Sequence, residues 1–327
     1  MSRKIDRLTE HIQETVVEKS EDELFRFAKY NRDEAERAGY SNYSYWASTW
    51  NSFLKNRMAL FFMIVLGVLL LFTIFQPLLP NQYSPVEVNL NPLTGMQDRN
   101  HKPDMIYWFG TNNIGQDLWA RLWSGTRTSL LIGIAVGLWN AVIGIAIGAL
   151  WGYVRQLDRL ITEVYNVLHN IPSTIILILA SYILRPSVTT MIMAMCVTGW
   201  LPMARFVRNQ IVIIRDREYN LASRCLGTPT GRLIVKNLLP YLVSVIMLRI
   251  ALAIPTAIGQ EVFLTYIGLG LPVSIPSLGN LINEGRLVMS SASYQLLFPA
   301  AVLSAITIAF YVMGNAFADA ADPKNHV

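Results

Sequence analysis

Hydrophobic residues in this 327-residue chain are gathered into long uncharged blocks, separated by polar connections. A helix rises about 1.5 Å per residue, so ~20 apolar residues cross the ~30 Å hydrocarbon core of a bilayer. Blocks of sufficient length recur along the chain, and one of them carries a single arginine. We therefore predict an all-α integral membrane protein with six transmembrane helices, at about 58–76, 128–153, 164–184, 188–204, 238–262 and 294–316.

Composition and charge support the membrane class, because 53% of the residues are hydrophobic and only 15% are charged. Lys and Arg gather in alternate connections and most densely at 205–237. Cytoplasmic loops carry this positive excess, so we expect 205–237 and both termini inside the cell, and 77–127 and 264–293 outside. The net charge of +5 is thus a topology signal and does not indicate nucleic-acid binding.

The chain divides around these spans. An amphipathic elbow helix is predicted at 43–57, because four apolar residues share one helical face there. These are Trp46, Trp50, Phe53 and Leu54. The other predicted segments are a cytoplasmic amino-terminal segment (1–42), a first span retained as a signal anchor (58–76), an extracellular loop (77–127), a membrane core (128–318) and a cytoplasmic tail (319–327).

The second span carries small residues every four positions along one side. They are Gly133, Gly137, Ala141, Gly144, Gly148 and Gly152. Such a row lets two helix backbones approach closely, so it predicts a seam for helix contact.

A polar, basic insert separates the fourth and fifth hydrophobic blocks. Within it, residues 216–227 suit a short helix with Asp216 as its cap, Glu218 in the first turn and Gly227 as its C-terminal stop. An apolar ridge runs along this helix at helical spacing, and such a ridge needs a groove to bind in. Its members are Tyr219, Ala222 and Leu226.

The phrase Leu221-Ala222-Ser223-x-x-x-Gly227, followed by Asn237-x-Leu239-Pro240, resembles the EAA loop of bacterial ABC importer permeases. It departs from that loop at Leu221, Ser223 and Asn237, where Glu, Ala and Ile are common. An ordinary amphipathic loop helix is the plainer explanation if the phrase stands alone. The resemblance implies a coupling helix at about 216–227 that meets an ATPase. The implied contact residues are Tyr219, Leu221, Ala222, Ser223, Leu226 and Gly227.

Other phrases resemble one permease subfamily, that of the dipeptide, oligopeptide and nickel importers. Residues 110–117 follow its frame Gly-Thr-Asp-x-x-Gly-Arg-Asp, with Asn112 and Gln116 in place of Asp and Arg. Two later phrases match as well, and the resemblance covers nearly everything from Trp46 to Ala318. The later phrases are Glu261-x-x-Leu264-x-Tyr266-Ile267-Gly268-Leu269-Gly270 and Pro276-Ser277-Leu278-Gly279-x-x-x-x-Glu284-Gly285-Arg286.

The resemblance implies a type I ABC importer permease fold, with an ABC permease core over 128–318. It implies a multi-pass protein of the bacterial inner or plasma membrane. The implied partners are a second, homologous permease subunit, two cytoplasmic ATP-binding subunits and an extracellular substrate-binding protein. Oligopeptides are the implied cargo, with dipeptides or nickel as alternatives. The sequence has no Gly-x-x-x-x-Gly-Lys-Ser/Thr loop, so we expect no ATP site by that route, no cofactor, no metal and no catalytic role.

Two other classes remain open at this point. A membrane enzyme needs clustered His, Asp or Glu, and none appears in the sequence. A secondary transporter needs ionisable groups at mid-membrane and paired broken helices, and the sequence offers His169, Arg249 and no internal repeat. A charge as deep as Arg249 must face protein or water. Three alternatives remain for it: a structural hydrogen bond to backbone carbonyls, a side chain that snorkels to the cytoplasmic side, or a residue of the transport pore.

Overall fold

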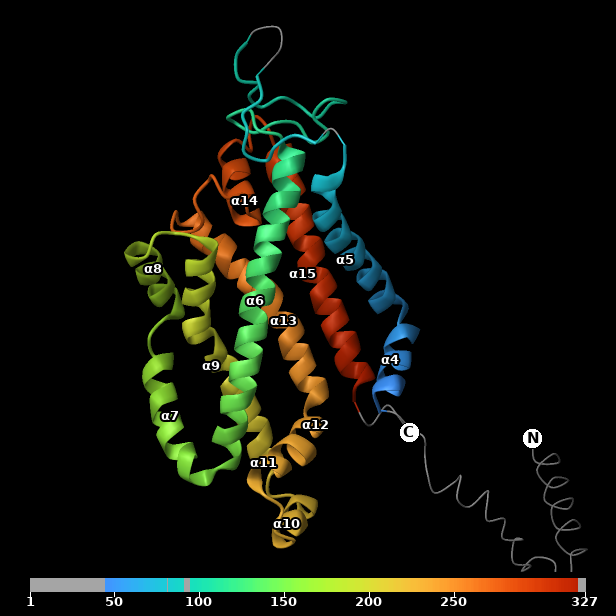
Figure 1. Ribbon diagram of the computed structural model, residues 1–327, viewed down its shortest axis with the longest axis vertical. Helices are drawn as coiled ribbons and strands as arrows, with labels where there is room; N and C mark the ends of the chain where they lie inside the picture. The colour runs from blue at the N-terminus through green and yellow to red at the C-terminus, as the bar shows by residue number, and fades with distance from the viewer. Residues whose placement is uncertain (1–44, 81, 91–94, 323–327) are drawn as a thin grey trace, which may run out of the picture. The chain divides into compact units, whose positions relative to one another are not determined.

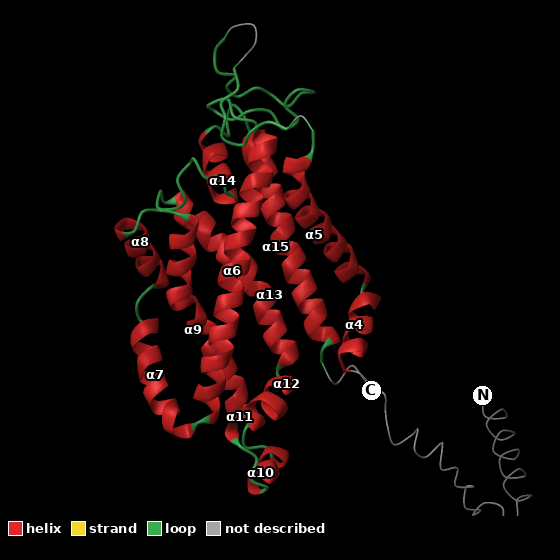
Figure 2. Ribbon diagram, in the orientation of Figure 1, coloured by secondary structure: helices red, strands yellow, loops and turns green. Residues whose placement is uncertain are grey.

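The computed structural model describes residues 45–80, 82–90 and 95–322 of the chain. The predicted segment 1–42 and the last residues of the predicted tail lie outside the described residues. The described part consists of helices and loops (Figure 2). Its only β-type pairings are two isolated bridges, Leu90 with Gln97 and Thr111 with Asp117, in the connection before residue 118, which is called the outer loop after its predicted side. Five described helices are long and apolar enough to cross a membrane, and there are six spans if a bent helix pair counts as one broken span. The predicted six-span, all-α class is confirmed.

The helices keep the labels of Figure 1. The five long membrane helices are α5 (Arg57–Phe75), α6 (Leu118–Tyr153), α9 (Val188–Ile214), α13 (Val243–Tyr266) and α15 (Tyr294–Ala320). The bent pair is α7 (Arg155–His169) and α8 (Ser173–Ile183). The shorter elements are α4 (Tyr45–Lys55), the 3₁₀ turn η1 (Gln76–Leu78), α10 (Glu218–Cys225), α11 (Thr230–Leu233), the π-helical η2 (Ile234–Leu238), α12 (Leu239–Tyr241) and α14 (Leu278–Leu287).

Helix α6 begins at Leu118, ten residues before the span predicted at 128. The prediction started late because the residues in between include charged side chains, which lower the hydropathy. Asp117 caps the helix, and its carboxylate accepts a hydrogen bond from the Ala120 backbone N–H at 2.8 Å. Arg121 is fully buried and pairs with Glu284 of α14 at 2.8 Å. Arg127 donates to the Thr73 carbonyl of α5 at 2.8 Å. Both guanidinium groups thus have partners within the protein. The helix can therefore extend beyond the apolar block that was predicted to cross the membrane.

The row of small residues on α6 forms the predicted close contact, and it does so within this chain. A Cβ placed on Gly148 would lie 2.4 Å from the Ala204 carbonyl oxygen of α9. On Gly144 it would lie 2.6 Å from the Cβ of Met203, and on Gly133 2.8 Å from Ile258 of α13. Helix α6 thus packs on α9 with its inner half and on α13 with its outer half.

The third span is broken where the sequence predicted a single helix at 164–184. Helix α7 ends at His169, and α8 starts after Pro172 at an angle of 67°. Proline fixes φ and disfavours helix in the preceding residue, so the chain turns there. His169 stacks on Tyr165, with 5.0 Å between the ring centroids. This contact fits the structural role expected of a lone histidine.

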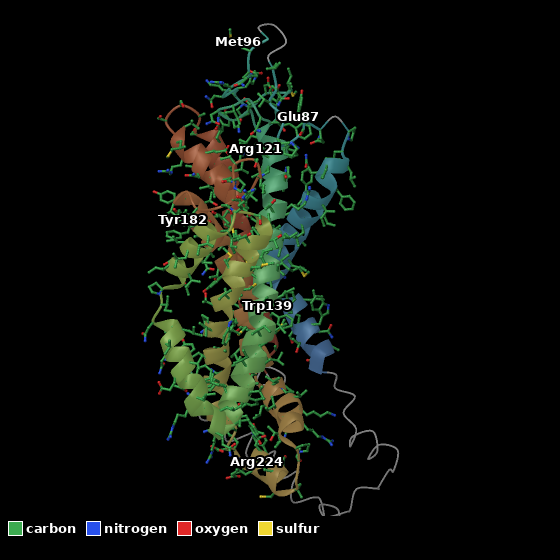
Figure 3. All side chains as sticks on the ribbon, turned by 60° about the vertical axis from the view of Figure 1, so that its left-hand side comes forward. Glu87, Met96, Arg121, Trp139, Tyr182 and Arg224 are labelled. Carbon is green, nitrogen blue, oxygen red and sulfur yellow. The ribbon has the colours of Figure 1, made fainter. Side chains whose placement is uncertain are left out.

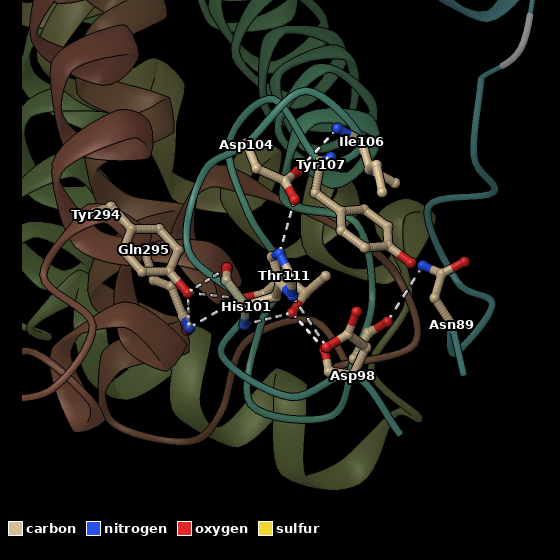
Figure 4. Close-up of polar contacts among 10 residues, drawn as sticks. Asn89, Asp98, His101, Asp104, Ile106, Tyr107, Thr111, Tyr294 and Gln295 are labelled. Atoms are coloured by element: carbon tan, nitrogen blue, oxygen red, sulfur yellow. Dashed lines mark hydrogen bonds and ion pairs between the residues drawn. The ribbon is translucent and has the colours of Figure 1, made fainter. Parts of the chain in front are cut away.

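The outer loop is fastened to the start of α15, as Figure 4 shows. Tyr294 donates its hydroxyl proton to the backbone carbonyls of His101 at 2.8 Å and Thr111 at 3.1 Å. The His101 ring lies between Asp98 at 3.1 Å and Asp104 at 2.8 Å. The hydrogen bond to Asp104 raises the pKa of His101, burial opposes that shift, and Asp98 adds to it. Protonated His101 therefore joins the two carboxylates of this loop.

Candidate functional site: coupling loop and membrane cavity

Helix α10 lies in the connection between α9 and α13, at the end of the helical bundle opposite the outer loop (Figure 1). It starts at Glu218, and the residue before it, Arg217, makes no side-chain cap. The prediction that Asp216 caps this helix is therefore wrong. Asp216 instead lies 3.2 Å from Arg155 at the start of α7 and 3.4 Å from Arg215. Cations on both sides hold its carboxylate away from the helix terminus.

The C-terminal end of α10 is the stop that the sequence predicted. Gly227 has φ +79°, a left-handed conformation that side chains rarely adopt. Its N–H donates to the backbone carbonyl of Arg224 at 2.9 Å, and the N–H of Thr228 donates to the backbone carbonyl of Ser223 at 3.1 Å. This pair of bonds is the Schellman arrangement. A Cβ on Gly227 would meet no atom within 4 Å, so backbone conformation and not crowding favours glycine here.

Two departures from the EAA phrase meet each other in the structure. The Asn237 amide donates to the Ser223 hydroxyl at 3.3 Å, and that hydroxyl donates to the Tyr219 carbonyl at 2.9 Å. An apolar pair in the usual phrase is thus replaced here by a hydrogen-bonded pair. Sequence reasoning missed Asn220, which is fully buried and donates to the Ile214 carbonyl at 2.8 Å. Asn220 ties α10 to the end of α9.

The apolar ridge predicted along α10 is exposed and unpartnered among the described residues. Tyr219 is 47% exposed, Ala222 is exposed, and Leu226, the C-cap residue, is 87% exposed. Leu221 is 42% exposed on another side of the helix. The side chain of Arg224 turns back toward the bundle, where its guanidinium lies 5.9 Å from the Tyr153 ring centroid (Figure 3). The structure therefore presents most of the predicted contact residues on one exposed loop.

A cavity of about 240 Å³ opens among α6, α8, α9 and α13. Arg249 lines it, with the guanidinium carbon 4.5 Å from the Phe206 ring centroid. No carboxylate in the described part of the chain forms an ion pair with Arg249. The remaining polar lining comes from Asn140, Ser173, Thr198, Thr256 and Gln260. Arg249 thus faces a mainly apolar cavity between membrane helices that carries a few polar side chains.

The phrases that resemble the peptide and nickel subfamily converge on the outer half of the bundle. Glu261 is fully buried and accepts hydrogen bonds from Ser277 at 2.8 Å, Ser129 at 3.1 Å and Thr265 at 3.2 Å. These bonds join α13 to α6 and to the start of α14. The three hydroxyls therefore hold the buried carboxylate and fasten these helices to one another.

The substituted positions of the 110–117 phrase also lie together. The Asn112 amide donates to Gln116 at 3.0 Å and to Glu284 at 3.3 Å. Arg121 donates to Gln116 and to Glu284. The subfamily's Asp and Arg are thus replaced by two neutral amides that bond each other beside the Arg121–Glu284 pair.

Several membrane-length helices, an exposed helix in a basic loop and a cavity between the membrane helices are the arrangement expected of a transport permease. Residues 144–327 match the family described as binding-protein-dependent transport system inner membrane component. Residues 44–103 match the N-terminal TM domain of oligopeptide transport permease C. The chain belongs to the binding-protein-dependent transport system inner membrane component family.

Curated relatives match over nearly their whole length. The oligopeptide transport system permease protein AmiD of Streptococcus pneumoniae is 36% identical, over 93% of this chain and 98% of the relative. The oligopeptide transport system permease protein OppC of Bacillus subtilis is 33% identical, over 92% and 97%. The dipeptide transport system permease protein DppC of Bacillus subtilis is 35% identical, over 93% of each.

A solved structure supports the fold. The inward-facing MetNI methionine ABC transporter matches with a TM-score of 0.50 and 20% identity, over 61% of this chain and 96% of that chain. The type I ABC importer fold predicted from the sequence is confirmed. As an ABC importer permease, the chain is the non-catalytic membrane part, ATP hydrolysis occurs in separate subunits, and ATPase and substrate-binding partners are implied. Across the residues that the structure describes, no group of three or more His, Cys, Asp and Glu could hold a metal ion.

Proposed function

We propose that this chain is the membrane subunit of an ATP-driven oligopeptide importer. It forms half of the translocation pore with a second, homologous permease subunit, and an extracellular binding protein delivers the peptide. The oligopeptide cargo is supported by the relatives at 36% and 33% identity that carry oligopeptide names. A relative named for dipeptides at 35% identity keeps dipeptides as the alternative. The single observation that carries the coupling mechanism is the exposed apolar face of α10.

Coupling runs through the 218–240 loop to two cytoplasmic ATP-binding subunits. In the helix-in-groove mode, Tyr219, Leu221 and Leu226 enter an apolar groove of one ATPase. Asn220 and the end of α9 transmit the movement, because the buried amide fixes α10 to the Ile214 carbonyl. ATPase closure then shifts the helical bundle as a rigid body between inward and outward openings.

Arg249 is proposed to line the pore and to offer a transient positive charge to a peptide carboxylate. Its place in the cavity, without a carboxylate partner among the described residues, supports this role. Arg249→Gln and Arg249→Lys should leave the complex assembled and its ATPase activity largely intact, while peptide uptake falls, less for Lys than for Gln. Loss of assembly in both variants would instead make Arg249 a structural residue.

The proposed topology places 77–127 and 264–293 outside, 205–237 and both termini inside, and the chain in a bacterial cell membrane. Met105 in the outer loop is 94% exposed, and the native Cys225 at the end of α10 is exposed. A membrane-impermeant maleimide should label Met105→Cys in intact cells and Cys225 only after permeabilisation. Labelling of Cys225 in intact cells would overturn this orientation.

Uptake measured with separated energy sources tests the function. Cells are depleted of ATP while the proton gradient is kept, and entry of labelled dipeptide, tetrapeptide and nickel is followed. The proposal expects tetrapeptide uptake that stops with ATP depletion. Uptake that continues on the proton gradient alone would make the protein a secondary transporter, and uptake of dipeptide or nickel only would correct the cargo.

A further inference from the structure

Helix α7 has three faces, and one of them attaches it to its own bundle. Tyr165 is 4% exposed and lies in a cluster with Trp151 of α6 and Leu201 of α9. Ile161 and Leu168 pack against the same cluster. These contacts fix α7 beside α6 and α9 and leave its other two faces turned away from them.

The second face is a narrow apolar stripe. Its five residues are spaced alternately three and four apart, and their exposed fractions lie between 36% and 65%. This alternation is the seam of a helix that packs lengthwise on another helix, with side chains fitting between those of the partner. The α7 stripe consists of Leu157, Leu160, Val164 and Val167 on the helix, and of Ile171 two residues past its end at His169.

The third face is polar and also exposed. It consists of Arg159, Glu163, Asn166 and Asn170. Leu168, which lies between the two asparagines along the helix, packs with Leu201 of the membrane helix α9, so this part of α7 lies at membrane depth. Acidic and amide side chains are costly against hydrocarbon. The outward side of α7 therefore faces protein or water and not lipid chains.

Helix α5 shows the contrast, because it is apolar on every side. Its exposed residues include Phe61, Ile64 and Leu71, and no charged residue follows Arg57 along it. A helix built for lipid has this composition. Helix α7 combines a narrow apolar seam with a polar face and needs a different neighbour.

We propose that the α7 stripe packs against a membrane helix of the second permease subunit, and that the polar face beside it borders the water-filled path between the cavity and the cytoplasm. The inference rests on the proposed function, in which this chain forms half of a pore. Ser173, the first residue of α8, lines the cavity and follows Asn170 by three residues across the 67° bend between α7 and α8. The polar face thus ends close in sequence to the cavity lining, and in a pore shared by two subunits the partner would supply the facing wall.

Site-specific photocrosslinking in the assembled transporter tests the contact. A benzophenone amino acid is placed at Val164, at Val167 and, as the control on the same helix at the same depth, at Asn166. We expect the stripe positions to form adducts with the second permease subunit, identified by mass spectrometry, and Asn166 to form far fewer. Adducts with lipid, with an ATPase or with another copy of this chain at the stripe would overturn the inference, as would equal yields at all three positions.

Two further measurements keep the outcomes separate. Val164→Asn combined with Val167→Asn should reduce the amount of second subunit that purifies with this chain, while Asn166→Val should not. Peptide uptake is recorded for the same crosslinker-bearing transporters. ATP-dependent uptake together with lipid adducts at the stripe would refute the α7 contact alone, whereas absent ATP-dependent uptake in the unmodified transporter would refute the proposed function.

Discussion

Gly148 tests the packing of the bundle with the smallest possible change, one methyl group. In Gly148→Ala the added Cβ would lie 2.4 Å from the Ala204 carbonyl oxygen and 2.9 Å from the Ala204 Cα. Both atoms belong to the α9 backbone and cannot rotate away. Ordinary contact begins at 3.4 Å, so α6 and α9 must separate locally by about 1 Å, the difference between 3.4 and 2.4 Å.

The expected loss follows from two opposed contributions. Overpacking of a well-packed interior costs about 1–3 kcal/mol. Replacing glycine by alanine inside a helix returns about 0.5–1 kcal/mol. The free energy of unfolding should therefore fall by roughly 1–2 kcal/mol. The loss should be larger in Gly148→Leu, whose longer side chain must also displace Val207, fully buried beside the seam.

The assay is the melting temperature of the purified transporter, with Gly67→Ala as the matched control. Gly67 is inside helix α5, and a Cβ there would meet no atom within 4 Å. We expect Gly148→Ala to melt several degrees lower, at roughly 2–4 °C per kcal/mol, and Gly67→Ala to melt at or above the unmodified protein. Equal melting of both variants would refute the close contact between α6 and α9.

Three other changes have defined outcomes. Gly227→Val should abolish peptide uptake without lowering membrane abundance, because the residue must hold φ +79° to end α10; normal uptake at normal abundance would sink the coupling assignment. Asn112→Asp places a second carboxylate beside Glu284, and Gln116→Arg places a second guanidinium beside Arg121. Each variant should lower the melting temperature, since like charges ~4 Å apart cost ~4 kcal/mol at an effective dielectric constant of ~20. The double variant should recover part of the loss, because its new charges are opposite, and additive losses would contradict the paired arrangement. Protection of the outer-loop amides against hydrogen exchange, expressed relative to the intrinsic exchange rate at each pH, should be full just below the ordinary histidine pKa of ~6.5 and should fall as the pH rises through the raised pKa of His101. His101→Asn should remove this fall in protection; an unchanged protection profile would exclude the ion pairs.

Much of the fold is legible in the sequence because lipid demands uninterrupted apolar length, and a 20-residue block is hard to mistake. Hydropathy fails where a charged residue inside a helix is paired with another residue of the protein. Arg121 looked like a loop residue, yet its pairing with Glu284 allows α6 to begin at Leu118. The start of α7 at Arg155 was missed for a different reason, because Asp158, Arg159 and Glu163 lie before the apolar block predicted at 164–184.

The candidate site was predictable where the chemistry is local and not where it is tertiary. The turn at Gly227 follows from one residue and its backbone needs, and the structure contains it. The cap at Asp216 failed because Arg155, sixty-one positions away in sequence, binds that carboxylate. The contact between Ser223 and Asn237 could be read only once the loop was folded. Their joint departure from the usual phrase was the available signal.

The central claim is that ATP hydrolysis drives peptide uptake through the apolar face of α10. The direct test is uptake of a labelled tetrapeptide into proteoliposomes that hold both permease subunits, the two ATPases and internal ATP, with the binding protein outside. Leu226→Asp, at an 87% exposed position on this face, is compared with Val235→Asp, a 61% exposed apolar residue of the same loop outside α10. We predict ATP-dependent uptake that Leu226→Asp abolishes and Val235→Asp retains. Uptake without ATP, or equal uptake by the two variants, would contradict the claim.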